Sequence, residues 1–527
     1  MESRLFAGLD VSTQSCKLVV LDWAERATVH VHVINYDSDL PQYETRGGVI
    51  QGLTRGVSES DPLMWLEAVD LVFDRLKASP VPQERIRSIS VSGQQHGLVA
   101  LTEKGGLARP RSKLWNDFST GEECRLLTEA VGGPENMIRE VGNSQRTGYT
   151  AAKIYHMRRH EPDAYRNAAT LFLVHNYINW YLTGGARVME PGDTSGTALW
   201  NPATGGWSQK VIQAIDPGLA DKLPPVRPPD RNIGTVSRDL ADRFGLDARC
   251  TVDAGSGDNM CGAVGTGNVR PGIVTVSLGT SGTAYTQMEE AFIDPLGEIA
   301  AFCDSTGRHL PLLCVSNLAN GYDALLDQLD LDHDGYGRLL QKTPAGNAGR
   351  VLLPWYTGER TPDLPLASPL YFGFALSDFR PEILARAVLE GHVLNLYEGF
   401  RRMPVEPDEI RLTGGLARSD AWCQAIADIF ATEAVPVEGE GASLGAALHA
   451  AWVWLNENGE EVSLEEVTTP FVIKTETRRR RPQDHARSAY DLQRRLFHSL
   501  ALRIRGKPGE DPFILRDQLA RMTSPFS

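Results

Sequence analysis

A β-hairpin pattern that occurs twice places the strongest constraint on the fold. Residues 7–22 (AGLDVSTQSCKLVVLD) and residues 274–286 (VTVSLGTSGTAYT) each hold a tight turn of Gly, Ser and Thr between two β-rich runs. The copies are separated by about half of the 527-residue chain, which is too far for a solenoid repeat and suits two similar domains. The sequence therefore predicts an internal duplication.

Composition narrows the class of protein and of partner. Hydrophobic residues make up 42% and charged residues 23% of the chain, which is ordinary for a globular protein of several domains. Asp and Glu total 67 against 53 Lys and Arg, a net charge of −14, so we expect no nucleic-acid partner. No apolar run approaches the ~18 residues that span a bilayer, and we expect a cytoplasmic protein without a membrane partner.

The cysteine and histidine patterns give little support for a metal or disulfide framework. The seven cysteines are scattered and form no CxxC pair, which favours a reducing compartment. His156 and His160 have the i, i+4 spacing of a metal-binding pair, but the sequence offers no third ligand such as HExxH provides. We assign this pair to a helix surface. The charge run TRRRRP (477–482) is likewise assigned to a solvated surface.

Strand and helix signals alternate along the chain, which favours an α/β fold with largely parallel, buried strands. Asp61 precedes a proline and an apolar pattern at helical spacing, which predicts a capped amphipathic helix. A β-rich run over residues 85–92 then ends in the polar loop GQQHG (93–97). Because open α/β sheets bind ligands beyond the carboxyl ends of their strands, this loop is a candidate ligand site.

Domain boundaries follow from the duplication. We place the first domain at residues 1–255 and the second at 256–460, with the boundary just before GSGDNMCGAVGTGNV. The proline-rich stretch 223–232 is treated as a loop, because β-like and apolar sequence continues after it. Residues 461–527 form a predicted helical extension without an assigned role.

The two hairpin turns have the chemistry of phosphate-binding sites. Backbone N–H groups in a tight polar turn, assisted by hydroxyls, can hold phosphates, and no GxxxxGK[ST] motif offers another route. Ordinary hairpin turns are the alternative interpretation. Asp10 ends an apolar strand without a Lys or Arg beside it, which suits a magnesium site, or else a carboxylate that hydrogen-bonds its own turn.

Three further segments carry candidate polar groups. Asp258 follows a β-like run and precedes a helix, where an N-cap is the alternative to a chemical role. Gln95 and His96 offer the donors and acceptors that a polyhydroxylated ligand needs, although a structural histidine is the alternative. The segment LWND, with Trp115 and Asp117, is a candidate apolar wall and carboxylate acceptor.

Ten segments in order over about residues 5–455 make the chain resemble the FGGY family of carbohydrate kinases, and within it the enzymes that phosphorylate xylulose. These segments are GLDVSTQSCK, SGQQHG, LWND, YTAAKIY, GDTSGTALW, GDNMCGAVGTG, VSLGTSG, LPWYTGERTP, LARAVLEG and LTGGLARSDAWCQAIADIF. The resemblance implies two ribonuclease H-like, actin-like ATPase domains with ATP in the cleft between them. The first domain would hold the sugar and the second the nucleotide.

The resemblance also implies roles for individual residues. Asp258 would be the catalytic base that takes the proton from the attacking sugar hydroxyl, and Asp10 would orient Mg²⁺, usually through water. The expected sugar-binding residues are Gln95, His96, Asp258 and Asn259. The expected ATP-binding residues are Ser12, Thr13, Gly279, Thr280, Gly415 and Ser419, of which the first four hold phosphates and the last two lie near the adenine.

The expected activity is ATP-dependent phosphorylation of D-xylulose to D-xylulose 5-phosphate, with Mg²⁺ and a ketopentose as ligands. L-ribulose, D-ribulose, sedoheptulose and glycerol are alternative substrates, although the GQQHG loop favours a ketopentose. A non-sugar actin-like ATPase is the alternative from another class, and a homodimer is left open as the assembly.

Overall fold

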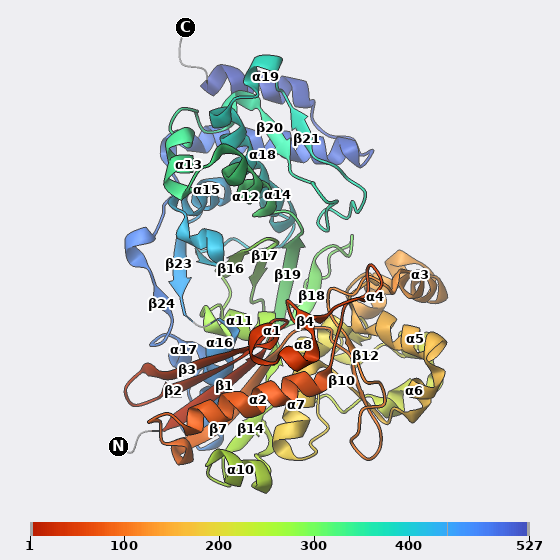
Figure 1. The fold of residues 1–527 in the computed structure, drawn as a ribbon. Coiled ribbons are helices and arrows are strands. Elements are labelled where there is room, and N and C mark those ends of the chain that lie inside the picture. Colours follow the sequence, from red (N-terminus) through yellow and green to blue (C-terminus); the bar gives the residue numbers. More distant parts are fainter. Residues whose placement is uncertain (1–3, 440, 524–527) are drawn as a thin grey trace. The chain divides into compact units, whose positions relative to one another are not determined.

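The computed structural model describes residues 4–439 and 441–523, which form two α/β units (Figure 1). The first unit comprises residues up to 270, residues 287–311 and residues from 439 to 472. The second comprises residues 271–286, 312–438 and those from 473 onward. The chain thus leaves and re-enters each unit, and each unit is described by itself below.

The first unit is built on a mixed sheet whose strands run in the spatial order β13-β14-β7-β1-β2-β3, with β15 also paired to β7. The strands β1, β2 and β3 form an antiparallel meander, whereas β7, β14 and β15 lie parallel to β1 or to one another. The strands are β1 (Leu5–Val11), β2 (Ser15–Asp22), β3 (Ala27–Asn35), β7 (Ile86–Gly93), β13 (Asn232–Thr235), β14 (Thr251–Asp253) and β15 (Ser256–Gly257).

The second unit repeats this arrangement in the order β19-β17-β16-β22-β23-β24. Strands β19, β17 and β16 are antiparallel neighbours, and β22 and β23 continue the sheet in parallel with β16. The strands are β16 (Ile273–Leu278), β17 (Gly282–Thr286), β19 (His309–Val315), β22 (Glu409–Thr413), β23 (Ala434–Glu438) and β24 (Ile473–Lys474). The hairpins β1–β2 and β16–β17 therefore hold equivalent places, and the predicted duplication is confirmed.

Short strand pairs and helices complete the two units. The short strands are β4 (Thr45–Arg46), β5 (Val49–Ile50), β6 (Glu59–Ser60), β8 (Val99–Leu101), β9 (Ser112–Lys113), β10 (Thr170–Phe172), β11 (Trp200–Asn201), β12 (Gly206–Trp207), β18 (Ala300–Cys303), β20 (Val351–Leu353) and β21 (Leu370–Phe372). The first unit's helices are α1 (Tyr36–Asp39), α2 (Pro62–Lys77), α3 (Gly121–Ala130), α4 (Pro134–Val141), α5 (Thr150–His160), α6 (Pro162–Asn167), α7 (Val174–Thr183), α8 (Pro191–Thr194), α9 (Gln209–Ile215), α10 (Arg238–Phe244), α11 (Asp258–Gly265), α16 (Ala442–Glu457) and α17 (Leu464–Thr468). The second unit's helices are α12 (Asn320–Leu329), α13 (His333–Leu340), α14 (Pro381–Phe400), α15 (Asp420–Phe430), α18 (Asp484–Ile504) and α19 (Pro512–Thr523).

Helix α2 confirms the helix predicted after Asp61. The Asp61 carboxylate accepts a hydrogen bond from the Leu63 backbone N–H at 2.8 Å, and Pro62 occupies the first helical position, where its missing N–H costs nothing. Its buried apolar face packs on β2 and β3. The first unit's sheet is therefore covered on this face by an amphipathic helix.

Helices α11 and α16 pack closely together and against β1 because small residues line their contact. A Cβ atom on Gly445 would lie 1.7 Å from the Cys261 carbonyl oxygen, and one on Gly8 would lie 2.1 Å from that of Ser443. These distances leave no room for any side chain, so the glycines allow backbone to meet backbone. This close packing of the small-residue segment 441–455 fixes α11 against the sheet.

No helix among the described residues is both long and apolar enough to cross a membrane. All seven cysteines are free.

Candidate active site

Parallel strand pairing brings two carboxylates to one edge of the first unit's sheet. Strands β1 and β15 both pair with β7, with Asp10 opposite Ser92 and Gly257 opposite Gly93. The carboxyl ends of parallel strands meet at the same edge of a sheet. Asp258, which follows β15 directly and begins α11, therefore reaches the edge where β1 presents Asp10, and the GQQHG loop follows β7 between them.

Asp258 sits in an environment that favours its neutral form. Burial, and after it the negative charges of Asp10 and Asp193, raise the pKa of its carboxyl to about 8. The Asn259 backbone N–H, at 2.8 Å from Oδ1, and the Asn259 side-chain amide, at 3.1 Å, act in the opposite direction. The N-cap of α11 is Gly257, so the alternative role of Asp258 as the N-cap is wrong.

Asp10 is also held in a partly buried position. Burial outweighs two opposing effects, a hydrogen bond that the Ser92 hydroxyl donates to Oδ1 at 2.8 Å and the charge of Lys17, and raises the pKa of the carboxyl to about 6. The register of β1 and β7 places Ser92 opposite Asp10, so the strand pairing itself supplies this donor. The first unit thus concentrates acidic side chains at one sheet edge, where a cation would stabilise their ionised forms.

An amide chain links Asn259 to the GQQHG loop and to a buried histidine. The Asn259 side-chain amide donates to Gln95 Oε1 at 2.8 Å, and Gln95 Nε2 lies 3.5 Å from Asp193 Oδ1. The other oxygen of Asp193 accepts a hydrogen bond from His175 Nδ1 at 2.9 Å. Gln95, Asp193 and His175 are all buried, so this chain fixes the orientation of the amides that border Asp258.

His96 is held in the left-handed region of the backbone, with φ = 65°. Its carbonyl accepts hydrogen bonds from Lys153 Nζ at 2.7 Å and from the Thr150 hydroxyl at 3.2 Å, both on α5. Its imidazole ring packs beside Tyr149 and Phe302, with centroid distances of 4.7 and 5.9 Å. The uncommon backbone conformation is therefore supported from both the carbonyl and the ring sides.

The turn of the first hairpin is ordered by its own polar groups. The Ser12 hydroxyl donates to the Ser15 carbonyl at 3.0 Å, and the Thr13 hydroxyl oxygen accepts from the Trp115 indole N–H at 2.9 Å. Gln94 adds a donor to the Ser12 carbonyl at 3.3 Å. These bonds orient the turn.

The two candidate residues of LWND have different surroundings. Trp115 is exposed and lies against the first hairpin turn through its bond to Thr13. Asp117 is fully buried, accepts from the Ser58 backbone N–H at 2.9 Å and from Lys113 Nζ at 3.2 Å, and is not presented to a ligand. The Ser119 hydroxyl donates as well, and these donors hold the pKa of the Asp117 carboxyl low despite the burial. Because the carboxylate is 0% exposed and already paired with these donors, the interpretation of Asp117 as a ligand acceptor is wrong.

The second unit presents an equivalent hairpin turn and a glycine pair. Gly279 and Thr280 lie between β16 and β17, and β16 pairs in parallel with β22, which ends just before Gly414 and Gly415. Gly414 has φ = 90°, and a Cβ there would lie 2.6 Å from the Leu278 carbonyl oxygen. By contrast, a Cβ on Gly415 would meet nothing within 4 Å, so this glycine leaves an open backbone surface.

Ser419 is 3% exposed and interacts with Tyr322. It occupies the N-cap position of α15, but its side chain makes no capping hydrogen bond. Ser419 also lines a cavity of about 1150 Å³ within the second unit, together with Arg418 and residues of α13 and α18. The first-unit candidates thus gather around one sheet edge, and the second-unit candidates follow the ends of β16 and β22.

Sequence reasoning missed several residues that organise the first-unit site. Asp193 lies in the segment GDTSGTALW, whose sequence indicates no role for it, and Ser92 marks only the end of the predicted strand. His175 and Lys153 lie on helices as buried polar side chains, at 0% exposure each. A lone polar residue between apolar or small neighbours, as in Ala152-Lys153-Ile154, is the sequence signal that could have found Lys153.

Two sequence comparisons connect these features to known proteins. Residues 5–265 match the N-terminal domain of the FGGY family of carbohydrate kinases, and residues 274–454 match the C-terminal domain of that family. The chain is 34% identical to the xylulose kinase of Haemophilus influenzae over 467 residues, which is 86% of this chain and 92% of the relative. It is 33% identical to the xylulose kinase of Streptomyces coelicolor over 88% of this chain and 90% of the relative.

Solved structures agree with the sequence matches. A xylulose kinase from Rhodospirillum rubrum superposes with a TM-score of 0.84 at 25% identity, covering 95% of this chain and 99% of that chain. A xyloylose kinase from Brucella ovis gives a TM-score of 0.85 at 25% identity, covering 95% of this chain and all of the other. With two duplicated α/β units and both family domains matched, the chain belongs to the FGGY family of carbohydrate kinases, phosphotransferases with an alcohol group as acceptor.

Proposed function

We propose that the protein phosphorylates D-xylulose with ATP to give D-xylulose 5-phosphate. The observation that carries this proposal is the grouping of Asp258, Asn259 and Gln95 at one sheet edge, joined by the 2.8 Å hydrogen bond from Asn259 to Gln95. Such a group offers a proton acceptor beside fixed amide donors and acceptors, which suits a polyhydroxylated acceptor. The similarity to xylulose kinases supports a ketopentose as that acceptor.

Asp258 is the proposed catalytic base. Its ionised carboxylate takes the proton of the sugar hydroxyl as the hydroxyl oxygen attacks the γ-phosphorus, and the bond from phosphorus to the bridging oxygen of ADP breaks. A pKa raised to about 8 makes Asp258 a stronger proton acceptor than an ordinary aspartate, which favours this role. Base assistance of this kind contributes roughly 10²- to 10⁴-fold, and positioning and charge stabilisation supply the rest.

The sugar is proposed to bind through Gln95, His96 and Asn259. Gln95 and Asn259 are oriented by their mutual hydrogen bond, and Gln95 is oriented further by the buried pair of Asp193 and His175. Because these amides are already ordered before the sugar arrives, sugar binding loses less conformational entropy.

ATP is proposed to bind through residues of both hairpins and of the glycine pair. Ser12 and Thr13 in the first unit, and Gly279 and Thr280 in the second, offer turn N–H groups and hydroxyls for phosphates. Gly415, with its open backbone surface, suits a flat purine, and Ser419 lies four residues further on.

The donor set at the sheet edge fits Mg²⁺. Asp10 and Asp258 come to the same edge, and the charge of Asp10 raises the pKa of Asp258, so a hard cation would relieve the repulsion between the two carboxylates. Asp10 is the residue proposed to hold Mg²⁺, through water. When bound, the ion would neutralise charge on the phosphates.

A substrate panel tests the proposal. The full chain is assayed for ADP release with Mg²⁺ and ATP on D-xylulose, L-ribulose, D-ribulose, sedoheptulose and glycerol, and without sugar. We expect D-xylulose to give the highest kcat/KM and the reaction without sugar to give almost no ADP. Equal ADP release with and without sugar would indicate a non-sugar ATPase, and a higher kcat/KM on another acceptor would reassign the substrate.

A further inference from the structure

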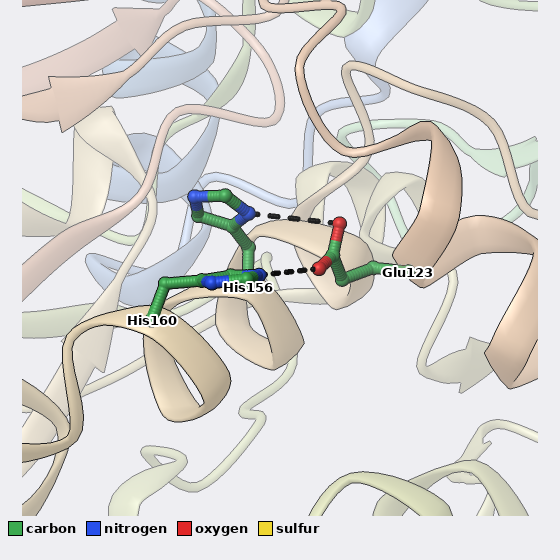
Figure 2. A group of neighbouring side chains, drawn as sticks. All are labelled: Glu123, His156 and His160. Carbon is green, nitrogen blue, oxygen red and sulfur yellow. Dashed lines mark hydrogen bonds and ion pairs between the residues drawn. The ribbon is translucent and has the colours of Figure 1, made fainter.

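The sequence around His156 and His160 offers no third metal ligand, but the structure brings one to them from another helix. Both histidines lie on α5, one turn apart on the same face, and Glu123 of α3 points its carboxylate at their rings. Figure 2 shows one imidazole ring opposite each carboxylate oxygen. The assignment of the pair to a plain helix surface is therefore incomplete, because the two rings face a buried acid.

The distances in this cluster suit a small divalent ion. His160 Nε2 lies 3.1 Å from Glu123 Oε1, and His156 Nδ1 lies 3.6 Å from Glu123 Oε2. One ligand atom from each residue lies within 4.8 Å of the others. Zinc binds imidazole nitrogen and carboxylate oxygen at about 2.0–2.2 Å, so neighbouring ligand atoms in a tetrahedral site are about 3.3 Å apart. The two observed distances lie on either side of this value.

The Glu123 carboxylate of this cluster is buried, whereas the two histidines are reached by solvent. The Glu123 side chain is 2% exposed, that of His156 is 21% exposed and that of His160 is 48% exposed. His156 Nδ1 is buried without a hydrogen-bond partner, although it faces Glu123. A bound ion would satisfy this nitrogen, and the exposed side of His160 leaves a path for the ion and a place for a coordinated water.

A metal ion would compete with neighbouring positive charges for the Glu123 carboxylate and for His156. Arg159 donates to Glu123 Oε1 at 2.7 Å, and the positive charge of Lys113 also acts on His156. Arg159 has a second acceptor, because its other terminal nitrogen lies 3.1 Å from Glu122 Oε1. The guanidinium can therefore stay ion-paired when Glu123 turns an oxygen to a metal.

We propose that Glu123, His156 and His160 form a binding site for Zn²⁺ or another divalent ion that prefers imidazole, separate from the proposed phosphoryl-transfer site. The ion would tie α3 to α5. Helix α5 also carries Thr150 and Lys153, which hold the His96 carbonyl, so the site would stiffen the support of the GQQHG loop. Its role is structural, and it takes no part in the transfer itself.

Metal titration of the full chain, stripped of metal and without nucleotide, tests this site. Excess Mg²⁺ is kept present to fill carboxylate sites, and Co²⁺ binding is followed by visible absorption and then reversed by Zn²⁺. His160→Ala and Glu123→Gln remove one ligand each, and His485→Ala replaces an exposed histidine of α18 outside the cluster as a matched control. Circular dichroism and the thermal unfolding of each metal-free variant check that it folds.

We expect the unchanged chain and His485→Ala to bind one equivalent of Co²⁺ with a low-symmetry visible spectrum and to gain thermal stability with Zn²⁺. His160→Ala and Glu123→Gln should lose about tenfold or more in Zn²⁺ affinity, together with that gain. Equal Zn²⁺ affinity in all four proteins, or no Zn²⁺-dependent stabilisation of the unchanged chain, would overturn the proposal and leave an ion-pair cluster with Arg159. These outcomes do not depend on which sugar is phosphorylated.

Discussion

Asp10 raises the pKa of Asp258, and the two carboxylates owe their proximity to β7, the strand with which both β1 and β15 pair in parallel. The negative charge of Asp10 adds to the effect of burial, which is the larger cause. Ionising a buried acid of this kind lowers the stability of the fold, but its raised pKa makes it a better proton acceptor. The effect on stability can be measured without any substrate.

The first prediction concerns the pH dependence of stability. The pKa of Asp258 is about 8 in the folded protein against 3.8 as its ordinary value, so between these pH values the folded form keeps a proton that the unfolded chain has lost. Raising the pH through this window therefore destabilises the fold. Asp258→Asn removes this contribution. We expect its Tm without ligands to exceed that of the unchanged chain, by an amount that grows from pH 5 to pH 8, in differential scanning calorimetry; a pH-independent difference would contradict the raised pKa.

A second prediction concerns Lys153 as a positioning residue for the GQQHG loop. Burial lowers the pKa of its ammonium group to about 7, yet it donates at 2.7 Å to the His96 carbonyl. Lys153→Met removes the donor and leaves a poorly paired carbonyl, at a cost of about 1–3 kcal/mol. We expect the sugar KM to rise roughly tenfold, with a smaller change in kcat and in the KM for ATP.

Steady-state kinetics of Lys153→Met and of Lys104→Met, an exposed lysine, provide the measurement and its control. Equal loss of kcat and of affinity for both substrates in Lys153→Met would indicate general damage to the fold rather than a role in positioning the loop.

A third prediction concerns the contact between α11 and α16. A side chain at Gly445 would overlap the backbone of Cys261, and neither helix can move without disturbing the start of α11 at Asp258. We expect Gly445→Ala to lower the free energy of unfolding by at least about 3 kcal/mol. Gly337→Ala, in a helix where a Cβ meets nothing within 4 Å, should instead be neutral or stabilising by up to about 1 kcal/mol. Urea denaturation compares the two variants, and similar stabilities would contradict the packing argument.

The parts of the fold that could be predicted are those that neighbouring residues determine. The hairpins around Ser12 and Gly279, the cap at Asp61 and the small residues near Gly445 each indicate a local geometry, and the structure contains all of them. The sequence does not state which distant segments return to a unit. Residues 439–472 rejoin the first unit because α16 buries its small-residue face on β1, a fact that only packing decides.

The same limit explains what was misread in side-chain chemistry. Glu123 meets His156 and His160 across two helices, so no spacing in the sequence reports the cluster. The charge run at 477–482 was assigned to a solvated surface, but Arg479 is only 18% exposed and pairs with Glu409 at 2.9 Å on β22. In both cases the partner is a charged residue of another element, which the local sequence cannot show.

Sugar-dependent ADP release by Asp258→Asn tests the central claim most directly, because the substitution removes only the proton acceptor while keeping the shape of the side chain. With D-xylulose, Mg²⁺ and ATP at saturation, the account predicts that kcat falls by at least ~10²-fold while the Kd for ATP, measured by calorimetry, stays unchanged. A variant that keeps its sugar-dependent turnover would show that Asp258 is not the base and would contradict the account.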